Sequence, residues 1–137
     1  MVVLIGIPAA GKTTVARTLF SSHETVSLDK LSNRTRNAED KLLMSLCKRG
    51  VDIVIDAANI DKLKRKRYLR FAKDYGYEIS AVMIDTSLDT ALARNDARER
   101  KVPEGAIRSY CEKLEYPHVD EGFAQIFIMW NDFDPRK

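Results

Sequence analysis

The segment from Gly6 to Thr14 constrains the fold of this chain more than any other. It reads Gly-Ile-Pro-Ala-Ala-Gly-Lys-Thr-Thr, which fits the pattern G-x-x-x-x-G-K-[ST]. The apolar run Val2 to Ile5 precedes it, and residues with helical spacing follow it. The two glycines let the backbone curl so that its N–H groups point inward. The segment therefore predicts a strand, an anion-binding loop and a helix in succession.

The rest of the chain continues this alternation of short β-branched runs with helical stretches, which is typical of a parallel sheet with crossover helices. We expect strands at Val2 to Ile5, Thr25 to Leu28, Val51 to Ile55, Ile79 to Ile84 and Ile126 to Met129. We expect helices at about Gly11 to Phe20, Ala38 to Arg49, Asp61 to Tyr75, Ser87 to Arg98 and Pro103 to Leu114. Together they predict one α/β domain over residues 1–137, a three-layer sandwich with a five-stranded, mostly parallel sheet.

Residues that favour helix caps support these boundaries. Gly50 and Gly76 are placed to end the second and third helices, since glycine adopts the left-handed conformation at little cost. Thr86 with Asp89 fits a capping box at the start of the fourth helix, and Pro103 suits the first turn of the last.

The composition is that of a globular chain, with 45% hydrophobic and 31% charged residues over 137 positions. The first five residues are apolar, a run too short for a signal peptide or a membrane span. We therefore expect a soluble intracellular, cytoplasmic protein with no membrane partner. The net charge of +3 indicates no particular partner by itself.

The residue types of the loop predict that it binds ATP with Mg²⁺, as in the P-loop NTPases. Lys12 supplies mobile positive charge, and the Thr13 hydroxyl is suited to a metal ion that bridges the phosphates. Thr14 can support the loop or contact the α-phosphate. The expected ATP-binding residues are Gly6, Pro8, Ala9, Ala10, Gly11, Lys12, Thr13 and Thr14. The alternative is a glycine turn without a ligand.

Carboxylates follow three of the expected strands, and the third, Asp85, is interpreted as part of a helix entry without a catalytic role. Because parallel strands end at one edge of the sheet, Asp29 and Asp56 should lie beside the loop. Asp56 ends a β-branched run, as does the acid that holds the Mg²⁺ water shell in P-loop enzymes. Asp29 is placed to accept a proton from an attacking hydroxyl or to orient it. Either residue can instead serve as a helix N-cap.

Two arginines are spaced for one face of the fourth expected helix. Arg94 and Arg98 are four residues apart, and guanidinium groups are suited to the charge that gathers on a moving phosphoryl group. Residues 98–102 are expected to form a loop that closes over ATP as an arginine-bearing lid. A solvated charged face is the alternative interpretation.

The third expected helix is strongly basic. It carries Lys62, Lys64, Arg65, Lys66, Arg67, Arg70 and Lys73 against only Asp61 and Asp74. Such a density of positive charge suits a nucleic-acid backbone. A plain amphipathic helix explains the same pattern, so both interpretations stay open.

The order of these motifs resembles the kinase domain of the polynucleotide 5′-hydroxyl kinases over nearly the whole chain. The segments that carry the resemblance are Val26-Ser27-Leu28-Asp29, Val54-Ile55-Asp56-Ala57-Ala58-Asn59, Arg67-Tyr68, Phe71-Ala72-Lys73, Tyr75-Gly76, Arg94-Asn95 with Arg98, Val102-Pro103, Glu115-Tyr116-Pro117 and Glu121-Gly122-Phe123. The resemblance implies ATP-dependent phosphoryl transfer to 5′-hydroxyl ends of DNA or RNA. It also implies that Asp29 is the general base and that Arg94 and Arg98 are the lid arginines.

The chain departs from the family pattern at two positions. Ala58 stands where the family usually has the Thr of Asp-x-Thr-Asn, and Ser32 stands where some members have an arginine three residues after the base. Arg34 or Arg36 is expected to substitute for that arginine. The expected acceptor-binding residues are therefore Asp29, Arg34, Arg36 and Asn59.

The resemblance also bears on partners. The family's phosphatase signature, Asp-x-Asp-Gly-Thr, does not occur in this sequence. A phosphatase or ligase, as a domain or as a protein of the same repair pathway, is an expected partner. Kinases of seryl-tRNA and of small alcohols share the loop, the acid and the lid arginine, and remain rivals. A nucleotide-binding switch without transfer activity is the third alternative.

Overall fold

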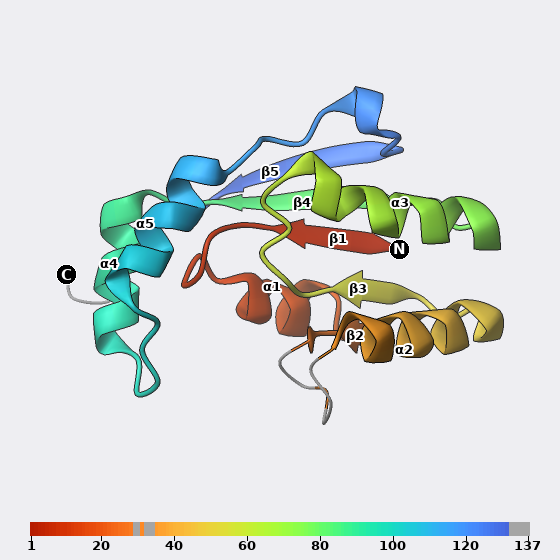
Figure 1. Cartoon of the computed structure of the whole chain (residues 1–137), viewed down its shortest axis with the longest axis horizontal. Coiled ribbons are helices and arrows are strands. Elements are labelled where there is room, and N and C mark those ends of the chain that lie inside the picture. Colours follow the sequence, from red (N-terminus) through yellow and green to blue (C-terminus); the bar gives the residue numbers. More distant parts are fainter. Residues whose placement is uncertain (29–30, 32–34, 132–137) are drawn as a thin grey trace.

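The computed structural model describes residues 1–28, 31 and 35–131. Its elements are β1 (Val2–Ile5), α1 (Lys12–Leu19), β2 (Glu24–Val26), α2 (Arg36–Arg49), β3 (Ile53–Ile55), α3 (Lys62–Tyr75), β4 (Ser80–Asp85), α4 (Leu88–Ala97), α5 (Glu104–Lys113), the short 3₁₀ helix η2 (Val119–Glu121) and β5 (Gln125–Trp130) (Figure 1). In the part of the chain so described, no helix combines the length and apolar character needed to cross a membrane.

The five strands form one sheet in the order β2-β3-β1-β4-β5, and every neighbouring pair is parallel. The predicted α/β class and strand number are confirmed. β2 is shorter than predicted, because it pairs with β3 and that strand ends where Ile55 lies opposite Val26. Ser27 and Leu28 therefore lie outside the strand.

Helices cover both faces of the sheet, and the alternation of side chains along each strand divides the core in two. Val3 and Ile5 of β1 pack in a cluster that includes Leu43 of α2 and Tyr68 of α3. Leu4, between them, packs in the opposite cluster with residues of α1, α4 and α5. Figure 1 shows the resulting three layers, with the amino ends of α1, α2 and α3 following the carboxyl ends of the strands.

The helix caps confirm two predictions and correct one. Gly50 and Gly76 end α2 and α3 with φ of 68° and 72°, in the left-handed region that favours glycine. The N-cap of α4 is Ser87 rather than Thr86, and its side chain accepts a hydrogen bond from the Thr90 backbone N–H. The Thr86 hydroxyl instead donates to the Asn131 carbonyl oxygen at 2.7 Å.

Candidate active site

The loop after β1 lies at the centre of the sheet and leads into α1. Ala9 and Gly11 have φ of 67° and 101°, so the backbone curls as the glycine pattern predicts. A Cβ on Gly6 would meet the Ile84 carbonyl oxygen at 3.0 Å, and one on Gly11 would meet the Asn131 side chain at 2.8 Å. Gly6 is favoured because the backbone of β4 lies close to it, and Gly11 because its φ lies in the left-handed region.

Lys12, the first residue of α1, folds back over this loop. Its Nζ donates to the carbonyl oxygens of Gly6 at 2.9 Å and of Ile7 at 2.8 Å. Burial is the main cause that lowers the pKa of Lys12, which is about 8; the Asp56 carboxylate opposes the shift and Arg98 contributes to it. An added anion would stabilise the charged form, so the side chain is suited to binding phosphate.

Thr13 and Asp56 meet at the boundary between β1 and β3. The Thr13 hydroxyl donates to Asp56 Oδ2 at 3.0 Å. Asp56 is buried at the end of β3, which pairs directly with β1, so the sheet order brings these residues together across 43 positions of sequence. A hydroxyl and a carboxylate side by side are oxygen ligands that fit Mg²⁺.

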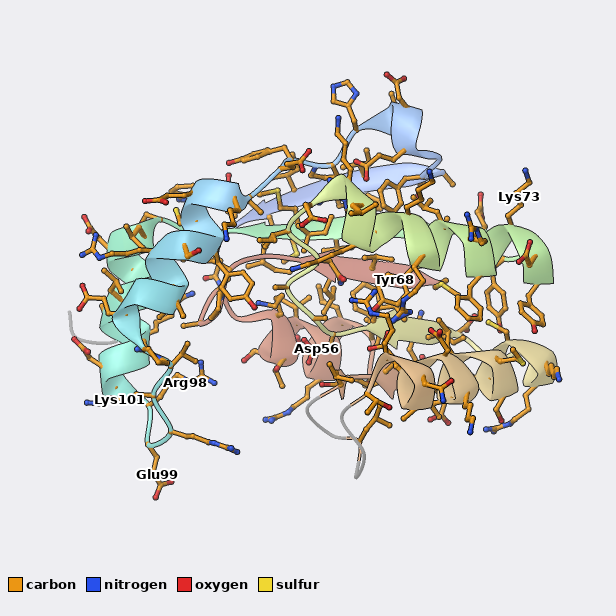
Figure 2. All side chains as sticks on the ribbon, viewed as in Figure 1. Asp56, Tyr68, Lys73, Arg98, Glu99 and Lys101 are labelled. Atoms are coloured by element: carbon orange, nitrogen blue, oxygen red, sulfur yellow. The ribbon has the colours of Figure 1, made fainter. Side chains whose placement is uncertain are left out.

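These side chains line a cavity of about 640 Å³, which falls within the usual size of a small-ligand site. Most of the predicted ATP-binding residues contribute to its wall, among them Pro8, Ala9, Gly11, Lys12, Thr13 and Thr14. Asp56, Arg94 and Arg98 also line it. Figure 2 shows Asp56 near the end of β3 and Arg98 on the connection between α4 and α5.

Arg94 contacts the loop itself. Its guanidinium donates to the carbonyl oxygen of Ala10 at 3.1 Å and to Asn131 Oδ1 at 3.0 Å. Asn131, directly after β5, in turn donates from Nδ2 to the same Ala10 oxygen at 3.0 Å. Asn131 was not among the predicted site residues. It follows the last expected strand, so the rule that parallel strands end at one edge of the sheet could have placed it beside the loop.

Arg98 lies beyond α4, not in its last turn as predicted. The helix ends at Ala97, and Arg98 has an extended backbone with φ of −82° and ψ of 145°. The predicted loop follows and is closed at its base by Asn95, whose side chain donates to the Val102 carbonyl at 2.7 Å and accepts from the Val102 N–H at 2.9 Å. Arg98 therefore reaches the cavity from a loop with a fixed base.

Of the four predicted acceptor residues, the structure describes Arg36 and Asn59. Asp29 and Arg34 lie outside the described residues. Arg36 is exposed at the start of α2 and lines a smaller cavity of about 190 Å³ beside the first. Asn59 is buried with φ of 48°, and its amide donates to the Leu4 carbonyl at 2.8 Å. This contact gives Asn59 a structural role in the turn after β3.

The basic character of α3 is partly internal. Arg65 is fully buried, and its guanidinium donates to both carboxylate oxygens of Glu121 and to the carbonyl oxygens of Asn59 and Glu115. Arg67 pairs with Glu39 of α2. These two arginines hold the fold together, whereas Lys62, Lys64, Lys66, Arg70 and Lys73 are exposed as the amphipathic pattern predicts.

The parallel sheet, the glycine loop with Lys12 and the Thr13–Asp56 pair define a P-loop nucleotide-binding domain of the kinase type. Residues 1–117 match the family model described as an AAA domain. Because this match covers most of the chain, the protein belongs to that family.

Two curated relatives match most of this chain. A bifunctional polynucleotide phosphatase/kinase of Schizosaccharomyces pombe is 28% identical over 133 residues, which cover 92% of this chain and 32% of that protein. An L-seryl-tRNA(Sec) kinase of Methanococcus maripaludis is 20% identical, with coverage of 85% and 53%. The chain thus spans about a third to a half of the length of these relatives. The resemblance to polynucleotide kinases is confirmed.

Solved structures show the same fold. A fungal RNA kinase superposes with a TM-score of 0.71 at 16% identity, covering 99% of this chain and 78% of that one. A gluconokinase of Sinorhizobium meliloti superposes with a TM-score of 0.68 at 17% identity, covering 95% and 81%. At these identities the likeness concerns the fold alone.

Proposed function

We propose that this chain transfers the γ-phosphoryl group of ATP to the 5′-hydroxyl end of a polynucleotide. The observation that carries the proposal is the position of the second, smaller cavity. It shares Leu28, Ala57, Ala58 and Tyr110 with the phosphate-loop cavity and has Arg36 and Lys64 in its wall. A donor site thus continues into a cationic acceptor site, as transfer to a polyanion requires. The polynucleotide kinase relative supports the same acceptor class.

The donor half of the site is assigned to ATP and Mg²⁺. Lys12 would turn from its carbonyl partners toward the β- and γ-phosphates, while Thr13 and Asp56 would hold the metal ion. When bound, the ion neutralises charge on the bridged phosphates. The backbone N–H groups of the loop and the amino end of α1 hold the remaining phosphate oxygens.

Arg98 is assigned to the transition state. Its side chain lines the cavity from the loop after α4 and is close enough to Lys12 to lower the pKa of that amine. A planar guanidinium matches the charge that develops on the transferred group. Arg94 holds the loop through Ala10 and is proposed to reach the phosphates from that position.

The acceptor half is assigned to Asp29 and to the basic residues at the amino ends of α2 and α3. Asp29 follows β2 in sequence, and we propose that it orients and deprotonates the attacking 5′-hydroxyl. Arg34 and Arg36 are proposed to contact acceptor phosphates. A phosphatase or ligase is the proposed partner in repair, since the relative in Schizosaccharomyces pombe is named for both phosphatase and kinase activities.

A second candidate function is transfer to another alcohol. The seryl-tRNA kinase relative favours it, because the same donor site serves any acceptor hydroxyl. Salt separates a polynucleotide acceptor from a small alcohol, whereas direct comparison of the two acceptors separates an oligonucleotide from seryl-tRNA. Contacts with several acceptor phosphates make the acceptor KM rise steeply with salt, whereas the KM of a neutral sugar changes little.

The experiment that tests the proposal measures transfer of labelled γ-phosphate from ATP to a panel of acceptors. The panel contains 5′-hydroxyl DNA and RNA oligonucleotides, nucleosides, seryl-tRNA and gluconate. The proposal predicts that kcat/KM is highest for an oligonucleotide and falls as salt rises. Higher kcat/KM for gluconate or seryl-tRNA would assign the chain to the second candidate function.

A further inference from the structure

β5 is the outermost strand on one side of the sheet. In the described part of the chain it pairs with β4 alone, whereas the central strand β1 pairs with both β3 and β4 (Figure 1). Three large apolar side chains of this strand are at least half exposed: Phe127 at 51%, Ile128 at 55% and Trp130 at 66%. Apolar side chains that gather at an exposed edge indicate an interaction surface.

The opposite edge of the sheet shows how such an edge is ordinarily protected. β2 has only three residues, Glu24–Val26, and Glu24 is exposed at its start. Short strands and charged side chains both oppose pairing with another chain. β5 has six residues, and the ten positions from Gly122 to Asn131 carry no charge, although 31% of the residues in the chain are charged. β5 therefore lacks both protections.

The backbone of β5 is also oriented for pairing on its outer side. Ser80 of β4 donates its N–H to the Met1 carbonyl oxygen, so the even positions of β4 face β1 and the odd positions face β5. Asp85 accordingly accepts from the Asn131 N–H. By the same alternation, the register of β4 with β5 leaves the even positions of β5 facing outward: Ile126, Ile128 and Trp130. Their N–H and C=O groups are directed to any strand that approaches this edge.

We propose that β5 pairs with the β5 strand of a second copy of this chain, antiparallel and about a two-fold axis at Ile128. In this register Ile128 lies opposite Ile128 of the second copy, and Ile126 lies opposite Trp130 on the same face. Phe127 lies opposite Met129 on the other face. Every pair is apolar, and two uncharged strands bring no like charges together. The contact closes at two copies, because it uses the outer edge of β5 on both.

The exposed area at β5 predicts a weak dimer. Its three exposed side chains offer on the order of 300 Å² of apolar surface on each copy, against about 800 Å² per partner in a standard interface. Hydrogen bonds between the two strands add to this, as they do wherever a strand is added to a sheet. We therefore expect a dissociation constant on the order of micromolar rather than nanomolar. This inference concerns assembly and does not depend on which acceptor the chain uses.

The test follows the mass of the full chain by sedimentation velocity, at concentrations on both sides of the expected dissociation constant. Ile128→Pro removes an N–H that faces outward and leaves the hydrogen bonds to β4 in place. Ile128→Lys brings two like charges together at the two-fold axis. Leu63→Lys is the matched control, because it adds the same charge at an aliphatic residue of α3 that is 80% exposed. Circular dichroism and thermal unfolding establish whether each variant is folded.

The wild-type chain and Leu63→Lys should both reach twice the monomer mass at high concentration. Each Ile128 variant should raise the dissociation constant at least about tenfold while remaining folded. A wild-type chain that stays monomeric at every concentration would overturn the proposal. So would a dimer that folded Ile128→Lys forms as readily as Leu63→Lys does.

Hydrogen exchange of the wild-type chain gives a second readout that needs no substitution. The amides of Ile126, Ile128 and Trp130 should exchange more slowly as concentration rises, because they become bonded only in the dimer. Those of Phe127 and Met129, which face β4, should exchange at rates independent of concentration. A dimer in which the three outward amides gain no protection would place the contact elsewhere and contradict the pairing of β5.

Discussion

Single residues at the phosphate loop are held by contacts within the protein. Lys12 is half-buried and donates to two carbonyl oxygens of its own loop, and burial lowers its pKa. Arg94 and Asn131 both donate to the Ala10 carbonyl oxygen. The protein itself therefore holds the loop in place, and we propose that Lys12 changes partners when ATP binds.

The lowered pKa of Lys12 predicts a pH dependence for nucleotide capture. With a pKa of about 8 in the free protein, the ammonium loses its proton as pH rises through that value. The kcat/KM for ATP should fall above about pH 8, because kcat/KM reports the free enzyme. In the ATP complex the phosphates favour the charged amine, so the alkaline limb of kcat should lie at higher pH. Identical limbs for both parameters would contradict this assignment.

Asn131 is predicted to position the loop and Arg94. Asn131→Ala removes the donor to the Ala10 carbonyl and the acceptor for Arg94, so kcat/KM for ATP should fall by about tenfold or more. Asn131→Asp keeps an acceptor for Arg94 but loses the donor, and should give an intermediate value. Gln125→Ala, at the other end of β5, is the control. Unchanged kinetics in Asn131→Ala would show that Arg94 holds the loop alone.

Among the elements, α2 and α3 are joined by a buried polar cluster. The Tyr68 hydroxyl donates to Glu39 Oε1 at 2.7 Å, and Arg67 pairs with the same carboxylate. Burial and the neighbouring Glu39 carboxylate raise the pKa of Tyr68, so its hydroxyl remains a donor. The cluster therefore ties α2 to α3 beside the small cavity, which Arg36 and Lys64 line from the first turns of these helices.

Loss of this cluster should destabilise the fold by amounts that depend on what is left buried. Glu39→Ala removes the acceptor of Tyr68 and one of the two carboxylates paired with Arg67, which keeps Asp40 at 3.1 Å, and should lower the free energy of unfolding by about 2 to 3 kcal/mol. Tyr68→Phe removes one hydrogen bond and should cost about 1 to 2 kcal/mol. Urea unfolding with a constant m-value measures both. Lys41→Ala, exposed on α2, should be neutral, and an equally neutral Glu39→Ala would contradict the cluster's role.

Across the whole molecule, the sequence predicted the features that depend on local residue chemistry and on the two-residue period of strands. The loop geometry followed from its glycines, and Asp56 reached Thr13 because parallel strands share an edge. Asn131 was missed because its neighbours depend on strand order, which no local pattern encodes. The sequence did not predict that Arg65 is buried, because its carboxylate partner, Glu121, lies 56 residues away. Because Asn59 follows a strand, its place at the edge of the sheet could be predicted. That its amide donates to the Leu4 carbonyl oxygen could not.

The proposed function depends on which atom accepts the γ-phosphoryl group of ATP. The most direct measurement gives the chain γ-labelled ATP and one oligonucleotide in two forms, with a 5′-hydroxyl or a 5′-phosphate, then digests the product to single nucleotides. Label should appear only with the 5′-hydroxyl form and only in its terminal nucleoside 5′-monophosphate. Lys12→Ala, which lacks the charge at the phosphate loop, should transfer less than about a tenth as much. No label in the oligonucleotide, or equal label in both forms, would contradict the central claim.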